Sequence, residues 1–166
     1  MDFFNKYVKP LIPYIIVVVV VLIIKTYIVT PIRVNGPSMN NTLYDKDIML
    51  LDEVSYRFDD IKRFDIVVVR YNDEYLIKRI IGLPGERVRY ENNKLYINGK
   101  YVKENFKHKK TEDFSEIVVS DNCYYVMGDN RTNSVDSRMI GDIKKSDIKG
   151  KTSLVLFPFS RFGKKL

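Results

Sequence analysis

The sequence lacks alanine and tryptophan altogether and contains a single cysteine and a single histidine among its 166 residues. The one cysteine, Cys123, excludes an internal disulfide and any metal site built from several thiolates. The histidine, His108, lies in the polar run KENFKHKKTEDF, which is typical of a solvated loop. If His108 is a surface residue, no Ser-His-Asp triad can operate in this protein.

Motifs for nucleotides, metals and nucleic acids are also missing. There is no glycine-rich phosphate loop and no His/Cys ligand spacing, so the sequence predicts neither a cofactor nor a metal. The formal net charge is +7, but the basic residues are scattered along the chain and interleaved with acidic ones. Without a zinc-finger, helix-turn-helix or RNA-binding signature, this charge favours a surface beside anionic lipid over a nucleic-acid binder.

One long apolar run occupies residues 11–24, between Lys9 and Lys25. By itself this run has the length of the hydrophobic core of a cleavable secretory signal. Apolar residues resume after Lys25, however, and residues 11–32 match the ~20 residues needed to cross a bilayer. Because no small-residue cleavage site follows, we expect an uncleaved transmembrane signal-anchor over residues 11–32, behind a short cytoplasmic N-terminus over residues 1–10.

Beyond the apolar run, segments rich in β-branched and aromatic residues alternate with turn residues. Asn92-Asn93 and Asn98-Gly99 predict hairpin turns, since both positions of such a turn need positive φ. No long stretch shows helical periodicity. The sequence therefore predicts a mainly β fold, with one antiparallel β-rich domain over residues 33–166. The expected strands lie within residues 47–58, 64–71, 75–82, 86–102, 116–120, 123–129 and 153–159.

Ser38 stands directly after a Gly-Pro pair in the stretch VNGPSMNNTLYDKD, residues 34–47. Serines in such loops are usually turn residues or caps, so this serine alone predicts no activity. A nucleophilic serine needs a nearby base and donors for an oxyanion. Because Pro37 has no N–H, the backbone amide of Ser38 is the candidate donor.

A candidate base lies in the stretch YLIKRIIGLPGERV, residues 75–88. In a strand, Lys78 would lie between aliphatic neighbours, and burial lowers the pKa of a lysine from ~10.4. Such an amine would be neutral near pH 7 to 8 and able to accept a proton, whereas Arg79 would stay protonated. The alternative is that Lys78 reaches solvent or pairs with an acid such as Asp65 or Glu74.

A third segment, GDNRTNSVDSRMIGDI over residues 128–143, brings hydroxyl, carboxylate and guanidinium groups together. It could be an ordinary polar loop held by ion pairs, which are worth little at a surface. The density of these groups instead favours a wall that fixes an active site. Its candidate residues are Asp129, Arg131, Ser134, Asp136 and Arg138.

In this order and behind an apolar segment, the three stretches resemble the conserved boxes of bacterial type I signal peptidase. This family consists of membrane serine endopeptidases that remove leader peptides from exported preproteins. GPSM is similar to its nucleophile box, YLIKRIIGLPGERV to its lysine box and GDNRTNSVDSRMIG to its C-terminal box. FDIVVV and SLVLFPFSRFG resemble family strands, and the short chain with a single anchor resembles the compact Gram-positive form.

The resemblance implies a role for each matching residue. Ser38 would be the nucleophile, its backbone amide an oxyanion donor, and Lys78 the general base of an acyl-enzyme reaction. Ser134 would orient the lysine, and Asp136 with Arg138 would form a supporting ion pair, with Asp129 in the same box. The residues matching the family's pockets for small side chains are Ile32, Val34, Met39, Leu43, Leu76 and Ile77.

The resemblance also implies how the substrate binds and where the protein acts. Residues 75–78 would pair with an extended substrate by strand addition. The implied partners are signal peptides with Ala-x-Ala-like sites, the lipid bilayer and the protein translocation machinery, with no nucleic acid. The implied location is the bacterial cell membrane, with the N-terminus cytoplasmic and the catalytic domain outside. Two alternatives stay open: a peptidase of a dedicated export or pilus system, and a catalytically silent membrane-anchored scaffold.

Overall fold

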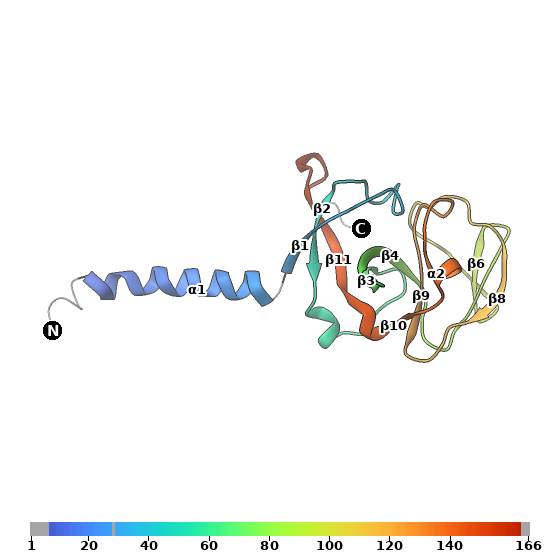
Figure 1. The fold of residues 1–166 in the computed structure, drawn as a ribbon, viewed down its shortest axis with the longest axis horizontal. Helices are drawn as coiled ribbons and strands as arrows, with labels where there is room; N and C mark the ends of the chain where they lie inside the picture. Colours follow the sequence, from blue (N-terminus) through green and yellow to red (C-terminus); the bar gives the residue numbers. More distant parts are fainter. Residues whose placement is uncertain (1–6, 28, 164–166) are drawn as a thin grey trace.

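The protein consists of one N-terminal helix followed by a β-rich domain, in a computed structural model that describes residues 7–27 and 29–163 (Figure 1). Helix α1 (Ile12–Tyr27) follows a short 3-10 turn, η2 (Lys9–Leu11), and extends away from the domain. Within the described ranges, no helix is both long enough and apolar enough to cross a membrane. Residues 1–6 of the predicted cytoplasmic segment and residue 28 of the predicted anchor lie outside the described residues.

The helix ends earlier than the predicted segment 11–32. It stops at Tyr27, and residues from Val29 onward form β1 (Val29–Arg33), which pairs with β2 (Ile48–Asp52). Pro31 explains the change, because proline lacks an N–H and disfavours helix in the residue before it. Proline is tolerated on an edge strand, and β1 is the first strand of its sheet.

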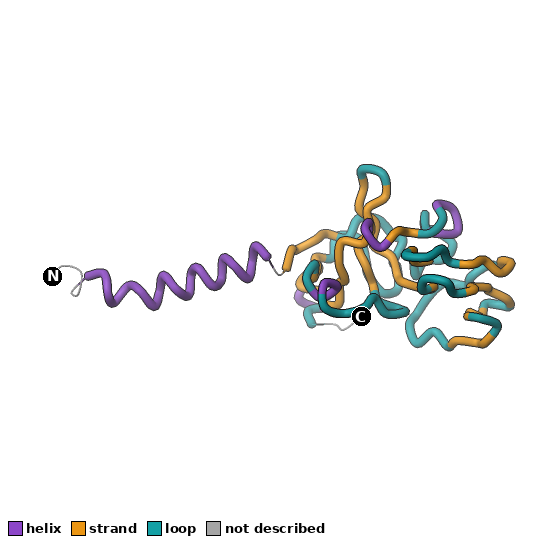
Figure 2. The backbone as a smooth tube through the Cα atoms, turned by 90° about the horizontal axis from the view of Figure 1, so that it is seen from below, coloured by secondary structure: helices purple, strands orange, loops and turns teal. Residues whose placement is uncertain are grey.

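Most strands belong to one antiparallel sheet of seven, in the order β1-β2-β11-β3-β4-β9-β10. A second sheet of four has the order β7-β6-β5-β8. Apart from α1, the described residues form only short helical turns, as Figure 2 shows. The prediction of a mainly β, antiparallel domain is confirmed. The remaining elements are β3 (Ile66–Tyr71), β4 (Glu74–Gly82), β5 (Arg87–Glu91), β6 (Lys94–Ile97), β7 (Lys100–Val102), β8 (Phe114–Val118), β9 (Cys123–Met127), α2 (Ser137–Ile140), β10 (Ile143–Lys144), β11 (Ile148–Phe157), and the 3-10 turns η3 (Ser55–Arg57), η4 (Lys145–Asp147) and η5 (Phe159–Arg161).

Turn chemistry in the sequence located the hairpins correctly. Asn92 and Asn93 join β5 to β6 with φ of 52° and 59°, and Asn98 and Gly99 join β6 to β7 with φ of 50° and 77°. The strand expected over residues 47–58 was too long. It ends at Asp52, whose carboxylate accepts hydrogen bonds from the two backbone N–H groups that follow Glu53 and so starts a turn.

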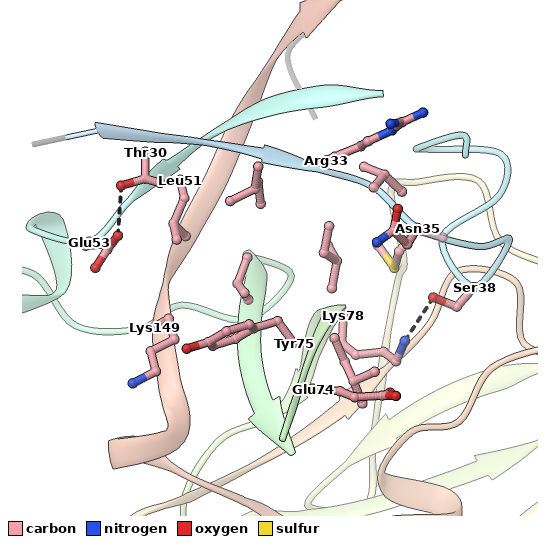
Figure 3. Close-up of a pocket in the computed structure, with 16 residues that line it drawn as sticks. Thr30, Arg33, Asn35, Ser38, Leu51, Glu53, Glu74, Tyr75, Lys78 and Lys149 are labelled. Carbon is pink, nitrogen blue, oxygen red and sulfur yellow. Dashed lines mark hydrogen bonds between the residues drawn. The ribbon is translucent and has the colours of Figure 1, made fainter. Parts of the chain in front are cut away.

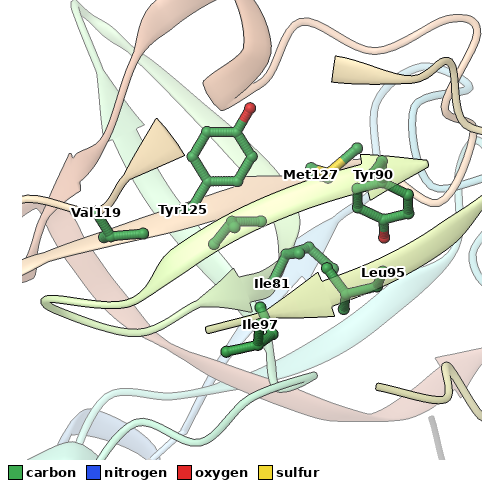
Figure 4. Close-up of a cluster of buried hydrophobic side chains, with 8 residues drawn as sticks. Ile81, Tyr90, Leu95, Ile97, Val119, Tyr125 and Met127 are labelled. Carbon is green, nitrogen blue, oxygen red and sulfur yellow. The ribbon is translucent and has the colours of Figure 1, made fainter. Parts of the chain in front are cut away.

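Three buried clusters form the core. The largest spans both sheets, because side chains of β4 and β9 in the large sheet pack on those of β5 and β6 in the small one (Figure 4). A second cluster lies along β3, β4 and β9. The third lies beneath the loop after β1 and therefore supports the segment that carries Ser38. It consists of Val34, Met39, Leu43, Met49, Ile66 and Val155.

Candidate active site

The loop after β1 holds Ser38 in a fixed turn. The chain reverses at Gly36, whose φ of 83° disfavours any residue with a side chain, and the Gly36 N–H donates to Asp45 Oδ1 at 2.9 Å. The carbonyl of Pro37 accepts from the N–H of Asn40 at 2.9 Å. Because Met39, next to Ser38, is fully buried, the serine is presented from an anchored backbone rather than from a mobile loop.

Lys78 lies against this serine. Its Nζ is 2.9 Å from Ser38 Oγ, and the lysine is only 2% exposed (Figure 3). Burial lowers the pKa of Lys78 from 10.5 to about 8, although the nearby carboxylate of Asp136 acts in the opposite direction. The pair therefore combines a hydroxyl with an amine that is largely neutral in mildly alkaline solution, which suits proton transfer from one to the other.

Asp136 is held by two groups of the same segment. Its carboxylate accepts from Arg138 Nε and Nη2, both at 2.8 Å, and from the N–H of Gly128 at 3.0 Å. Burial raises the pKa of Asp136, but these hydrogen bonds together lower it by more than burial raises it. The pKa of Asp136 therefore lies below its usual value. Asp136 also caps α2, which begins at Ser137. This carboxylate is therefore a fixed negative charge beside the dyad.

The structure places Ser134 beside Gly128, without a hydrogen bond to Lys78. Its buried hydroxyl lies beside the carboxylate of Asp136 and helps to keep the pKa of Asp136 low, although no described residue is placed at ideal hydrogen-bond geometry to it. A Cβ on Gly128 would lie 2.3 Å from Ser134 Oγ. The role of Ser134 toward the lysine stays a prediction.

Asp129 forms a buried ion pair with Arg79 that the sequence did not reveal. Arg79 Nε and Nη2 bind the two carboxylate oxygens at 2.9 and 2.7 Å, and both side chains are almost completely buried. Thr42, from the loop that carries Ser38, donates its hydroxyl to the same carboxylate. Asp129 thus joins β4 to the nucleophile loop. The available signal was an arginine directly before the aliphatic residues Ile80 and Ile81, because an arginine buried beside them needs an acidic partner.

Arg131 belongs to a second buried network. It donates to Glu104, Tyr90 and Thr111 at 2.6 to 2.7 Å. Its guanidinium also donates from Nε to the carbonyl of Gly128 at 3.1 Å. This network ties the small sheet to the segment after β9.

The structure corrects the prediction for His108. Its side chain is 13% exposed, and its Nε2 lies 3.3 Å from Glu104 Oε2, so it is a partly buried member of the Arg131 network rather than a solvated residue. It does not line the groove that holds Ser38 and Lys78.

A groove of about 870 Å³ runs from Ser38 between two strand edges. Among the described residues, β1 pairs only with β2. Residues 74–78 of β4 likewise pair only with β3, since the contact of β4 with β9 begins at Arg79. In Figure 3 these two edges face each other across the groove. The lining includes Ile32, Val34, Met39, Leu76 and Ile77, as predicted from the family resemblance.

Leu43 was predicted to line this groove but does not. It is completely buried in the cluster beneath the nucleophile loop. The N–H of Leu43 donates to the carbonyl of Met39 at 2.9 Å, which curls the chain so that the leucine side chain faces the core. The lining also includes the polar residues Thr30, Glu53, Glu74 and Lys149.

Comparisons with known proteins identify relatives of this chain. The family model for signal peptidase, peptidase S26, matches residues 6–157. Signal peptidase I of Bacillus amyloliquefaciens is 41% identical over 162 residues, which cover 90% of this chain and 88% of that protein. Signal peptidase IB of Staphylococcus aureus (strain COL) is 36% identical over 165 residues, covering 87% and 86%. The crystal structure of a signal peptidase I from Enterococcus faecalis is 34% identical, with a TM-score of 0.51, and the match covers 56% of this chain and 97% of that one.

Proposed function

The chain belongs to the signal peptidase family, peptidase S26, whose members are serine endopeptidases that cleave signal peptides from secreted preproteins, and we propose that here Ser38 and Lys78 carry out this cleavage. The observation that supports this assignment is the 2.9 Å contact between the Ser38 hydroxyl and a buried amine of lowered pKa. This contact favours an active peptidase over a catalytically silent scaffold. Burying a lysine without an ion-pair partner destabilises the fold, and a catalytic role for the amine accounts for its presence.

The reaction proceeds through an acyl-enzyme. Neutral Lys78 accepts the proton of Ser38 Oγ while this oxygen attacks the scissile carbonyl, and the resulting oxyanion accepts from the backbone N–H of Ser38. The tetrahedral intermediate collapses, and the lysine passes its proton to the departing amine of the mature protein. Lys78 then takes a proton from a water molecule as its oxygen attacks the ester carbonyl. When the bond between this carbonyl and Ser38 Oγ breaks, Lys78 returns the proton to Ser38 Oγ, and the signal peptide leaves with a new carboxylate. In this scheme Asp136 fixes the segment that lies beside Lys78, and Ser134 would orient the amine of Lys78.

The substrate binds as a strand between the two free edges. β1 and residues 74–78 of β4 both run toward the dyad, so residues before the cut would lie along both edges and hydrogen-bond to each. Side chains that alternate along such a strand meet the aliphatic lining. This arrangement accounts for selection of small residues just before the cut.

Replacing the last residue before the cut tests both the function and this binding mode. With a labelled preprotein and the purified protein in detergent, we expect a single cut after a small residue, identified by N-terminal sequencing of the product. Phenylalanine in place of alanine at that position should slow cleavage at least about tenfold, because the aliphatic wall leaves no room for the ring. Equal rates for the two preproteins would refute the pocket, and absence of cleavage would refute the function.

Cleavage should also depend on pH through Lys78. The neutral amine is the active form, so the rate constant should rise with pH through about 8, reach a plateau above it, and fall about tenfold for each pH unit below. Circular dichroism over the same range would show that the fold is unchanged. A plateau that already extends below pH 6 would contradict a lysine base.

The same proposal includes the location. Residues 14–21 of α1 are all apolar and exposed, with exposed fractions from 47% to 71%, and a helix that is apolar on every side favours lipid over water. We therefore place α1 in the bacterial cell membrane, with the N-terminus cytoplasmic and the β-domain outside, where exported preproteins emerge from the translocation machinery.

A further inference from the structure

We propose that Asn130 is a positioning residue that aims the backbone N–H of Ser38 at the oxyanion; this inference rests on the proposed function. Asn130 is 7% exposed and follows Asp129, whose carboxylate is fixed by Arg79. Two of its groups point at the nucleophile turn. Its backbone N–H donates to the carbonyl of Ser38 at 3.0 Å, and its side-chain Nδ2 donates to the carbonyl of Pro37 at 3.1 Å.

These two carbonyls belong to the peptide planes on either side of the Ser38 Cα. Because each peptide unit is planar, holding both carbonyls fixes φ and ψ of the serine, and with them the direction of its side chain. In a trans peptide the N–H points opposite to the preceding C=O. A Pro37 carbonyl that faces Asn130 therefore turns the Ser38 N–H away from it, and no described residue accepts a hydrogen bond from that N–H.

The turn itself provides only part of this restraint. The carbonyl of Pro37 also accepts from the N–H of Asn40, but that bond lies within the turn and can move with it. Asn130 belongs to the segment after β9 and connects the turn to the buried Arg79–Asp129 pair. Thr132 Oγ1 donates to Asn130 Oδ1 at 3.3 Å, which leaves Nδ2 as the group that faces the turn.

Asn130 does not touch the reacting atoms, so its loss should affect the transition state more than substrate binding. Removing a direct oxyanion donor typically costs ~10²–10³ in kcat, and loss of a group that only orients the donor should cost less, about 10- to 100-fold. The KM should change little, because the groove is lined by other residues. The pH at half-maximal rate should stay the same, because it reflects Lys78.

The test compares Asn130→Ala and Asn130→Asp with Asn133→Ala in the full-length protein in detergent, on a labelled preprotein. Aspartate has the shape of asparagine but cannot donate to the Pro37 carbonyl. Asn133 is an exposed asparagine of the same segment and is the matched control. Both Asn130 variants should lose about 10- to 100-fold in kcat per folded molecule at nearly constant KM, while Asn133→Ala keeps the wild-type rate. The pH midpoint is compared for Asn130→Ala, which adds no charge near Lys78, and should stay the same.

Several outcomes would overturn the inference. One is a kcat per folded molecule within twofold of wild type for Asn130→Ala. Another is a change confined to KM. A third is a shifted pH midpoint for Asn130→Ala, which would mean that Lys78 itself had moved. The folded fraction comes from thermal melts monitored by circular dichroism. An active Lys78→Ala variant would instead refute the proposed function on which this inference rests.

Discussion

Replacing Lys78 with methionine or arginine should abolish cleavage of a labelled preprotein while the fold persists. Methionine keeps most of the buried side-chain volume but has no amine, so nothing accepts the proton of Ser38 Oγ, 2.9 Å away. Arginine is a long basic side chain like lysine, but its guanidinium stays protonated and cannot act as a base. General-base catalysis typically contributes ~10²–10⁴-fold, and the rate constant should fall by at least that factor.

Stability measurements make this result interpretable. Burial holds the pKa of Lys78 near 8, which shows that the charged form is disfavoured in the folded protein. The methionine variant should therefore melt at the same temperature as wild type or higher near neutral pH. Lys94→Ala, at an exposed position of β6, is the matched control and should cleave normally. Arginine at position 78 with substantial activity would be incompatible with a lysine base.

Replacing Gly128 with alanine should inactivate the enzyme by crowding rather than by removing a functional group. The new Cβ would lie 2.3 Å from Ser134 Oγ and 2.5 Å from the carbonyl oxygen of Ser38. Neither neighbour is the flexible end of a long side chain, so the nucleophile turn or the segment after β9 must shift. A displacement of about 1 Å can reduce a rate ~10²-fold. Overpacking should also cost about 1–3 kcal/mol of stability.

Gly99→Ala separates these two effects. Gly99 lies in the turn between β6 and β7 with φ of 77°, and a Cβ there would meet nothing within 4 Å. Alanine in this left-handed conformation should cost roughly 1–2 kcal/mol without disturbing the site. Both variants should be destabilised, but only Gly128→Ala should lose cleavage per folded molecule. If the two lose activity equally, crowding at the dyad is not the cause.

Local chemistry determined what could be predicted from the sequence. Asparagine and glycine pairs located two hairpins, β-branched runs located most strands, and the aliphatic surroundings of Lys78 indicated a buried amine. The apolar run does not show where α1 ends: the helix stops at Tyr27, and Pro31 favours the extended chain of β1.

Contacts between distant segments could not be predicted in the same way. The Arg79–Asp129 pair joins residues that become neighbours only through the pairing of β4 with β9. The inward direction of Leu43 depends on one backbone hydrogen bond within its loop. The contact of Asn130 with the nucleophile turn depends partly on the main-chain N–H of Asn130. Neither leaves a pattern in the sequence, because main-chain groups are the same for every residue.

If preproteins bind as a strand between β1 and residues 74–78 of β4, as we propose, this binding mode limits when a preprotein can be processed. A chain segment can pair with both walls only if both of its own edges are unused. In a segment inside a folded sheet, the backbone N–H and C=O groups on both edges are already hydrogen-bonded to neighbouring strands. In a helix they are hydrogen-bonded within the helix. Cleavage would therefore have to precede folding of the residues around the cleavage site. A preprotein that folds quickly on the outer side of the membrane would keep its signal peptide and stay attached to the membrane.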